Sequence, residues 1–386
     1  MKKNCHYSIF LITLLLSGCH QIEKRNFFHI KNPEKKSALD FPLSEICSDI
    51  QYIKLDSIIP LAGIRKIEFD HDIIVLQDKI KGIIKFDKTG KFLSQIGSIG
   101  KGPGEYSLTY SKFTIGNNGK NVYVLDHFKD VLVFDENNQY TNKFSINGEI
   151  IANDVFSISQ NRLLFASGNP TGDFKYKWIV TDNSGKMIYT KKNSVNFKIK
   201  KGAGPLPAQI IFKRDSIVYY FEQYNDTIFQ IGPDSFKTFG FFDLGKYRLT
   251  PEIAERDGLF NAGNSYLIPL NIYETRKYLI IEYIYKNFKM ALFNKETEEL
   301  NIINNCPAPK RLLNDFDSGL PFSPISEFNN HLTCVVNPFE LKKHVASDAF
   351  KNSTPKFPEK KKELEKLANS LNENDNPVLM LVKLKE

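Results

Sequence analysis

The sequence DIIVLQDKIKGIIKFDKTGKFLSQIG, residues 72–97, followed by SIGKGPGEY, residues 98–106, decides the fold. The first part predicts three short β-strands, because runs rich in Ile, Val, Leu and Phe are separated by short polar turns that contain glycine. Residues 97–106 hold four glycines and a proline, which allow backbone angles that other residues avoid. They predict an exit loop after the third strand.

The strand and turn pattern repeats along the chain. Residues 86–92 (FDKTGKF) match residues 134–140 (FDENNQY) at an offset of 48, and residues 181–187 (TDNSGKM) follow at an offset of 47. Looser copies continue to the C-terminus and bring the number of units to six. A four-stranded unit of this length cannot bury both of its faces alone, so the sequence predicts an all-β fold, a six-bladed β-propeller of four-stranded blades.

The sixth unit lacks an outer strand of its own. Residues 50–55 (IQYIKL), which precede the first blade, can supply that strand and close the ring. A helical insertion is expected at about 339–374, because Leu364, Leu367, Ala368 and Leu371 lie on one helical face. We expect this helix to dock on the propeller rim, and a partner helix or a membrane surface is the alternative.

The N-terminus has the features of a lipoprotein signal. Two lysines, an apolar run over residues 9–16 and the sequence Leu16-Ser-Gly-Cys19 predict a signal peptide at 1–18 and a lipidated Cys19. An uncleaved anchor or a free buried cysteine is the alternative. Residues 19–40 are polar and predict a flexible tether, which could span about 70 Å if extended. The propeller is then expected over residues 41–386.

Charge and cysteine content exclude some classes of protein. Loss of residues 1–18 removes two lysines and no acids, which changes the net charge from +8 to +6. This mild charge is spread along the chain, so no nucleic-acid partner is expected. The cysteines of the predicted propeller are Cys47, Cys306 and Cys334, without CxxC spacing, and no metal site is expected. Cys306 and Cys334 could form a disulfide.

Four stretches resemble a known family: residues 41–55, the GxGPGEY loop ending at Tyr106, residues 314–322 and residues 375–384. The chain resembles the six-bladed β-propeller lipoproteins of Gram-negative gut bacteria, whose blades are similar to NHL-type blades. This resemblance implies an exported, membrane-tethered propeller, and it brings no catalytic residues.

The glycine loop is the main candidate site, and two interpretations are open. Either Glu105 caps backbone amides and Tyr106 packs between blades, or the loop contacts a ligand or partner. The residues of this candidate site are Lys101, Gly102, Pro103, Gly104, Glu105 and Tyr106.

Two further groups of polar residues are weaker candidates. His127 follows Asp126 in a predicted turn on the same face as the glycine loop, where it could contact the ligand or act as a general base. Residues 314–319 (NDFDSG) are similar to the start of a calcium loop but lack the closing Glu, so a turn held by aspartates is favoured.

The sequence therefore predicts a lipid-anchored binding or scaffold module for an envelope protein, peptide or glycan. No catalysis and no cofactor are expected. The residue after Cys19 is His20, which favours the outer membrane, on either its periplasmic or its surface side. The alternative function is a propeller enzyme of lactonase or lyase type, with a metal or a histidine in the central funnel.

Overall fold

The structure is a computed structural model, and it describes residues 26–385 apart from 31–32, 34–40, 117–118, 147–149, 170–171, 195–196, 198–208, 215–216, 223 and 304–311. The predicted signal peptide, the predicted lipidation site Cys19 and Cys306 lie outside the described residues. Structural statements below refer to the described part of the chain.

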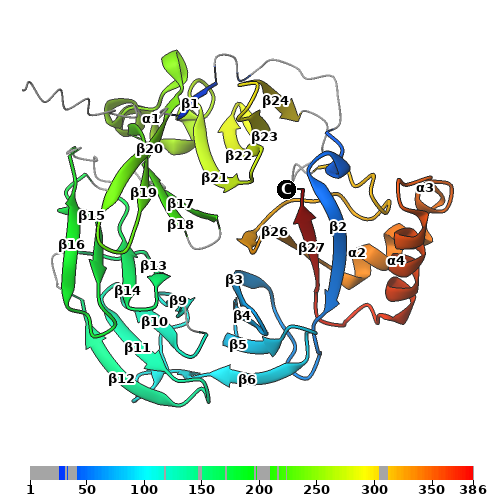
Figure 1. Cartoon of the computed structure of the whole chain (residues 1–386), viewed down its shortest axis with the longest axis horizontal. Helices are drawn as coiled ribbons and strands as arrows, with labels where there is room; N and C mark the ends of the chain where they lie inside the picture. The colour runs from blue at the N-terminus through cyan, green and yellow to red at the C-terminus, as the bar shows by residue number, and fades with distance from the viewer. Residues whose placement is uncertain are drawn as a thin grey trace, which may run out of the picture.

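Six blades, each with a four-stranded antiparallel meander, are arranged around a central axis (Figure 1), which confirms the predicted propeller. Blade 1 consists of β3 (Ile64–Asp70), β4 (Ile73–Asp78), β5 (Gly82–Asp87) and β6 (Phe92–Ile96). Blade 2 consists of β9 (Lys112–Ile115), β10 (Val122–Asp126), β11 (Asp130–Phe134) and β12 (Tyr140–Ser145). Blade 3 consists of β13 (Asp154–Ser159), β14 (Arg162–Ala166), β15 (Tyr176–Thr181) and β16 (Met187–Lys192).

Blades 4 and 5 follow the same meander order, from an inner to an outer strand. They consist of β17 (Gln209–Arg214), β18 (Ile217–Glu222), β19 (Asn225–Ile231) and β20 (Phe236–Asp243); and β21 (Ile268–Glu274), β22 (Tyr278–Tyr285), β23 (Asn287–Asn294) and β24 (Leu300–Ile303). Helix α1 (Pro251–Ala262), which the sequence analysis did not predict, lies between these two blades along the chain.

The repeated sequence motif is explained by one hydrogen-bonded turn in blades 1 to 3. In each blade an aspartate at the start of the turn, Asp87, Asp135 or Asp182, accepts hydrogen bonds from the amides two and four residues later, at 2.8–3.0 Å. Such aspartate turns favour a residue of positive φ at the fourth position. In blade 1 that residue is Gly90, with φ 90°, and a Cβ there would lie 2.2 Å from the carbonyl oxygen of Lys54.

Blade 6 closes the ring with strands from both ends of the chain. It consists of β25 (Ser326–Phe328), β26 (His331–Val336), β27 (Val378–Leu384) and β2 (Cys47–Lys54). The N-terminal strand β2 pairs antiparallel with β27, with Ile50 opposite Val382, and β27 pairs with β26 on its other side. The predicted closure is confirmed.

The insertion in blade 6 is helical, as predicted. It comprises α2 (Pro338–Ala346), α3 (Asp348–Lys351) and α4 (Pro358–Ser370), which lie outside β2 in Figure 1. Leu364, Ala368 and Leu371 are buried in the same apolar cluster as Ile50 of β2. This helix face therefore docks on the rim of blade 6.

Residues 26–30 correct the predicted tether. Asn26–His29 form strand β1, which pairs in parallel with β20 as a fifth strand of blade 4. Phe28 is only 1% exposed, and its ring packs edge-on against Phe293 of blade 5 at 5.3 Å between centroids. An open sheet edge is a ready template for a further strand, and Phe28 and Ile30 gain burial by covering the edge of β20.

The meander of each blade defines two faces of the ring. The connection from an outer strand to the next inner strand opens on the same face as the turn between the second and third strands, because neighbouring strands are antiparallel. We call this side the loop face and the other side the opposite face. In blade 2 the Ser107 amide, in the connection that leads to the inner strand, donates a hydrogen bond of 3.1 Å to Asp126, at the turn between the second and third strands.

Candidate functional site

The inner strands of all six blades line a central cavity of about 580 Å³. Its charged lining residues are balanced in sign, with four basic and four acidic side chains besides His71: Arg65, Lys66, Lys112 and Lys213; Glu68, Asp70, Asp154 and Glu327. Residues 97–106 do not line this cavity, so the predicted loop site is separate from it.

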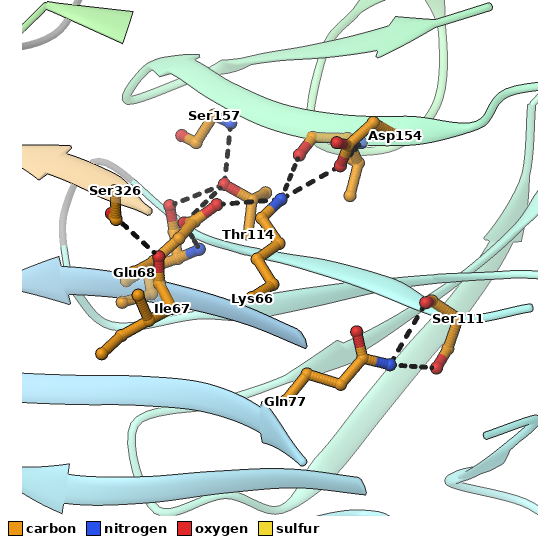
Figure 2. Close-up of polar contacts among 11 residues, drawn as sticks. Lys66, Ile67, Glu68, Gln77, Ser111, Thr114, Asp154, Ser157 and Ser326 are labelled. Atoms are coloured by element: carbon orange, nitrogen blue, oxygen red, sulfur yellow. Dashed lines mark hydrogen bonds and ion pairs between the residues drawn. The ribbon is translucent and has the colours of Figure 1, made fainter. Parts of the chain in front are cut away.

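Lys66 connects two blades at the cavity wall (Figure 2). Its Nζ atom lies 3.2 Å from Oε1 of Glu68 in β3 and 3.0 Å from Oδ1 of Asp154 in β13. Burial alone would lower the pKa of Lys66, but the carboxylates of Asp154 and Glu68 raise that pKa above its usual value. The lysine therefore stays charged and is shared by two carboxylates.

Hydrogen bonds extend this network across further inner strands (Figure 2). The amide of Ile115 donates to Oε2 of Glu68 at 2.9 Å, and the Thr114 hydroxyl donates to the same oxygen at 3.1 Å. The Ser157 amide donates to the Thr114 hydroxyl at 3.1 Å, and the Ser326 hydroxyl donates to the carbonyl of Ile67 at 3.2 Å. These polar groups join blades 1, 2, 3 and 6 and stabilise the ring.

We expect the substitution Lys66→Ala to lower the free energy of unfolding by about 2 kcal/mol, because it leaves two partly buried carboxylates without their shared cation. A folded pKa above 10.5 means that the contribution of Lys66 is fully present below pH 10.5 and is lost as the pH rises through the folded pKa. Urea unfolding at pH 7 and at high pH measures both effects. A loss below about 0.5 kcal/mol at pH 7 would contradict the structural role.

In the glycine loop, Glu105 folds back onto the backbone. Its Oε2 atom accepts hydrogen bonds from the amides of Lys101 at 2.8 Å and Gly102 at 2.7 Å. The short strands β7 (Ser98–Ile99) and β8 (Glu105–Tyr106) pair in parallel across the loop. The structure thus contains the cap that the first interpretation predicts for Glu105, in which the loop is a structural connector. Lys101, Gly102 and Pro103 are exposed to solvent.

Tyr106 is fully buried in an apolar cluster formed by residues of blades 1 and 2, as the connector interpretation predicts. Its hydroxyl donates to the carbonyl of Ile96 at 2.9 Å and accepts from the amide of Ile83 at 2.8 Å. Burial raises the pKa of Tyr106 to about 12. Gly104 is also buried, with φ 74°. Of the predicted loop site, only Lys101, Gly102 and Pro103 therefore present exposed groups to a partner.

The Glu105 cap gives a prediction for hydrogen exchange. The amides of Gly102 and Lys101 lower the pKa of the Glu105 carboxyl below 4.5. Protection of these two amides should therefore be present above pH 4.5 and be lost as the pH falls through the lower, folded pKa. In Glu105→Ala the protection should fall severalfold at pH 7, whereas Glu105→Gln, which keeps a neutral acceptor, should lose less and show no such pH dependence. Equal protection in all three proteins would contradict the cap.

His127 and Phe128 are the two central residues of the turn between β10 and β11. Both have positive φ, 46° and 67°, and the Lys129 amide donates to the Asp126 carbonyl at 3.2 Å. The side chain of Asp126 accepts from the loop, as described above, and its Oδ2 lies 3.8 Å from Nε2 of His127. The ring centroid of Tyr110 lies 5.6 Å from that of His127 and 5.5 Å from that of Phe128.

Exposed apolar side chains gather on the loop face of blades 1 and 2, which the sequence analysis did not predict. They stand in successive connections and turns between residues 55 and 153 and are 37–68% exposed; we call them the apolar tips: Ile58, Ile80, Ile99, Tyr110, Phe128 and Ile151. Backbone contacts join their segments, since the Lys79 amide donates to Gly63 at 2.9 Å and the Ala152 amide to Phe128 at 3.0 Å. The segments that carry the apolar tips therefore lie side by side in pairs on the loop face of two neighbouring blades.

Charges around the apolar tips are mainly basic. The exposed lysines beside the apolar tips are Lys79, Lys81, Lys101 and Lys129. Three carboxylates of the same segments accept hydrogen bonds from backbone amides: Asp78 from Gly63, Ile80 and Lys81, Glu105 from Lys101 and Gly102, and Asp126 from Ser107. This surface thus presents apolar groups and positive charge to solvent.

Comparison with known proteins identifies the family. A family model described as "Domain of unknown function (DUF4934)" matches residues 26–383. The chain belongs to this DUF4934 family. The match begins at Asn26, the first residue of β1, so the strand that replaces the predicted tether is part of the DUF4934 domain. No curated protein matches the sequence.

Solved structures similar to this DUF4934 chain show the fold. A crystal structure described as that of a "Putative exported protein" from Bacteroides fragilis NCTC 9343 has a TM-score of 0.66 and 20% identity, and the similarity covers 94% of this chain and 99% of that one. Two further structures are more distant. BamB from Moraxella catarrhalis has a TM-score of 0.36 and 11% identity over 66% of each chain. A chain of a nidogen–laminin complex has a TM-score of 0.36 and 10% identity over 63% of this chain and 80% of that one.

The structure also describes the predicted aspartate turn at residues 314–319 and Cys334. Asp317 is fully buried, accepts from the Gly319 amide at 2.8 Å and from the Tyr52 hydroxyl at 2.8 Å, and belongs to the aspartate-held turn favoured above. Cys334 is buried with its Sγ 3.8 Å from Sδ of Met380.

Among the described residues, no group of three or more His, Cys, Asp or Glu side chains could hold a metal ion. None of the described helices is both long and apolar enough to cross a membrane.

Proposed function

We propose that this protein is a lipid-anchored propeller of the cell envelope whose loop face binds a protein or peptide partner. The sequence Leu16-Ser-Gly-Cys19 supports lipid anchoring, with the outer membrane as the expected site, and the description of the Bacteroides fragilis neighbour supports export. Of the partner classes expected from the sequence, a protein or peptide fits this surface better than a glycan, because the surface combines aliphatic side chains with lysines.

The observation that carries the proposal is the set of apolar tips. Large apolar side chains scattered singly are normal on a surface, but contiguous patches rimmed by polar residues are typical of interaction sites. Here the apolar tips occupy neighbouring segments of blades 1 and 2 on a single face. The polar side chains of the inner strands, such as Lys66, Glu68 and Asp154, instead form ion pairs and hydrogen bonds with one another across the blades.

The backbone of the turn at Phe128 adds a second argument. A bulky residue with positive φ costs energy of about 1 kcal/mol or more, and such strain concentrates at binding sites and other functional positions. The two central positions of this turn type favour Asn and Gly, yet the chain has His127 and Phe128 there. The strained turn holds an aromatic ring outward, beside Tyr110, where it is available to a partner.

Charge identifies the chemistry of the partner. Among the described residues of these segments, the fully exposed charges beside the apolar tips belong to lysines, and Asp78 and Glu105 accept hydrogen bonds from backbone amides. A partner with apolar side chains surrounded by Asp and Glu would complement this surface. Lys79 and Lys81 flank Ile80 directly and are the strongest candidates for contacts to such acids.

Position-specific photo-crosslinking in cells tests the proposal. A crosslinking amino acid at position 80 or 128 should give one discrete adduct with another envelope protein. The matched control is position 217, where Ile217 is also exposed but lies at the turn between β17 and β18, on the opposite face. Adducts at all three positions, or none at positions 80 and 128, would overturn the proposal, as would an adduct with a second copy of this chain.

A charge series tests the partner chemistry on the same surface. Lys79→Glu with Lys81→Glu should remove the adduct formed at position 128, whereas Lys79→Arg with Lys81→Arg should keep it. Neither pair changes a buried side chain, so folding is expected to be retained and can be checked by thermal unfolding. An adduct unaffected by the glutamate pair would argue against an acidic partner.

A further inference from the structure

We infer that β1 holds the outer edge of blade 4 close to the lipid surface and directs the loop face of blades 1 and 2 away from it. This inference rests on the lipid anchoring of Cys19 proposed above. It concerns the membrane as a second partner of the propeller, and it assigns blade 4 as the membrane-proximal part of the ring.

The strand β1 is held by several independent contacts. Four residue pairs join it to β20, from Asn26 opposite Gly240 to His29 opposite Asp243. Nδ1 of His29 lies 2.8 Å from Oδ2 of Asp243, and the Ile30 amide donates to the Asp243 carbonyl at 3.1 Å.

Aromatic packing adds to this attachment. Phe28 is buried against Phe293 of blade 5 and lies in one apolar cluster with Phe242 of β20. The lysine Lys289 donates to the carbonyl of Pro33 at 3.1 Å, beyond the end of the strand. β1 is thus a fixed part of the propeller, and the lipid anchor acts on the propeller at Asn26.

The length of the segment between Cys19 and Asn26 limits the distance to the membrane. Seven Cα steps at about 3.3–3.6 Å each span at most about 25 Å. An eight-residue strand such as β20 has a similar length, about 26 Å. If the chain were instead free up to residue 40, the reach would be about 70 Å. Pairing of β1 therefore shortens the tether nearly threefold.

The direction of β1 determines which side of blade 4 faces the lipid. β20 is an outer strand and runs from the opposite face toward the loop face, and β1 is parallel to it. Asn26 is therefore the end of β1 nearer the opposite face, and the chain leads back from there toward Cys19. In a six-bladed ring, blade 1 lies across the axis from blade 4, as Figure 1 shows. The apolar tips of blade 1 consequently lie across the ring from the attachment, and those of blade 2 lie beside them on the loop face.

Energy transfer from the protein to a lipid-headgroup acceptor tests this orientation. The full-length lipidated protein, with Cys306→Ser, is placed in phosphatidylethanolamine and phosphatidylglycerol vesicles. A donor dye is attached through Lys237→Cys at the exposed start of β20, or through Leu93→Cys on the exposed outer strand of blade 1. Transfer should be severalfold more efficient from position 237 than from position 93.

Two variants change the tether without removing the lipid. A flexible Gly-Ser insertion of about twelve residues after Gln21 should reduce the difference between positions 237 and 93, and it leaves every described residue unchanged. Phe28→Asp should release β1 and have the same effect. Equal transfer from both positions in the unmodified tether, or a difference that survives the insertion, would overturn the orientation.

Mass spectrometry of Cys19 separates this inference from the proposal on which it rests. If Cys19 carries no acyl chain, the lipid anchoring and the orientation are both wrong. If Cys19 is acylated and the transfer is equal at positions 237 and 93, the anchoring stands and the orientation alone is wrong. The photo-crosslinking of positions 80 and 128 is independent of both outcomes.

Discussion

Removal of residues 376–386 is expected to abolish folding of the whole propeller. This deletion takes away β27, which is paired on both sides, with β26 and with the N-terminal strand β2. Without β27, the strand β2 has no neighbour in blade 6 and the ring cannot close. The helices α2 and α4 lose part of the surface on which they dock, because Val378, Met380 and Val382 belong to the same apolar cluster as Leu341 and Leu364.

The size of the effect follows from the burial of β27. Five of its apolar side chains are at most 2% exposed: Val378, Leu379, Met380, Val382 and Leu384. Each is worth about 1.5–3 kcal/mol when fully buried, so the strand contributes on the order of 10 kcal/mol. The net stability of a typical protein is about 5–15 kcal/mol. Loss of the strand therefore removes most or all of the stability.

Thermal unfolding and size-exclusion chromatography measure this outcome. A point variant, Val382→Asp, introduces a charge at a fully buried position of the same strand and should also remove the cooperative transition. The matched control is Lys383→Ala, which changes the exposed neighbour and should leave the transition unchanged. A truncated protein that is monomeric and melts cooperatively near the temperature of the full chain would contradict the role of closure.

The propeller could be predicted from the sequence because its turns repeat a strict chemical requirement. Asp87, Asp135 and Asp182 each accept two backbone hydrogen bonds, and each turn needs a residue of positive φ three positions later. A requirement of this kind leaves the same residues at a constant spacing even where the strands themselves differ. The closing strand was predictable for a related reason, since the last unit lacked one strand.

The strand β1 could not be predicted in the same way. Parallel pairing with β20 depends on an open edge that is more than 200 residues away in sequence, and β1 carries no turn or alternation of its own. The signal was the short apolar group Phe27-Phe28 and Ile30 within a polar segment. The burial of Phe28 and Ile30 became evident only when the edge of blade 4 was in place.

The glycine loop shows how far the candidate site could be predicted. Capping by Glu105 and packing by Tyr106 follow from residue types alone, because a carboxylate beside free amides and a tyrosine among glycines have few other roles. The apolar tips were missed because a single isoleucine or phenylalanine in a turn has the same residue type as a core residue. The available signal was the placement of Ile80 between two lysines and of Phe128 beside Lys129.

Disruption of the buried pair Lys177–Glu222 is the other change with a large expected effect. Lys177 of β15 in blade 3 forms an ion pair with Glu222 of β18 in blade 4, and the two side chains are 1% and 0% exposed. The second carboxylate oxygen of Glu222 has no hydrogen-bond partner among the described residues. Each charge is therefore compensated mainly by the other, across the contact between two blades.

We expect Glu222→Gln or Lys177→Met alone to lower the free energy of unfolding by about 3–5 kcal/mol, because either change leaves one buried charge without its partner. The double variant Lys177→Met with Glu222→Leu removes both charges and leaves two apolar side chains at the contact between the blades. It should recover most of the loss and could exceed the stability of the original chain. Urea unfolding of the four proteins gives the coupling energy between the two positions.

An exposed pair of the same type is the matched control. Lys88 and Asp72 lie 2.7 Å apart, but both side chains are more than half exposed, so Lys88→Met should give no measurable change. Both pairs consist of one lysine and one carboxylate, and they differ in burial. A larger loss of stability at Lys177–Glu222 than at Lys88–Asp72 would therefore be attributed to burial. If the single variants at Lys177 and Glu222 were as mild as the control, the two charges would not depend on each other. If the double variant were as unstable as the sum of the single variants, packing rather than charge would account for the loss.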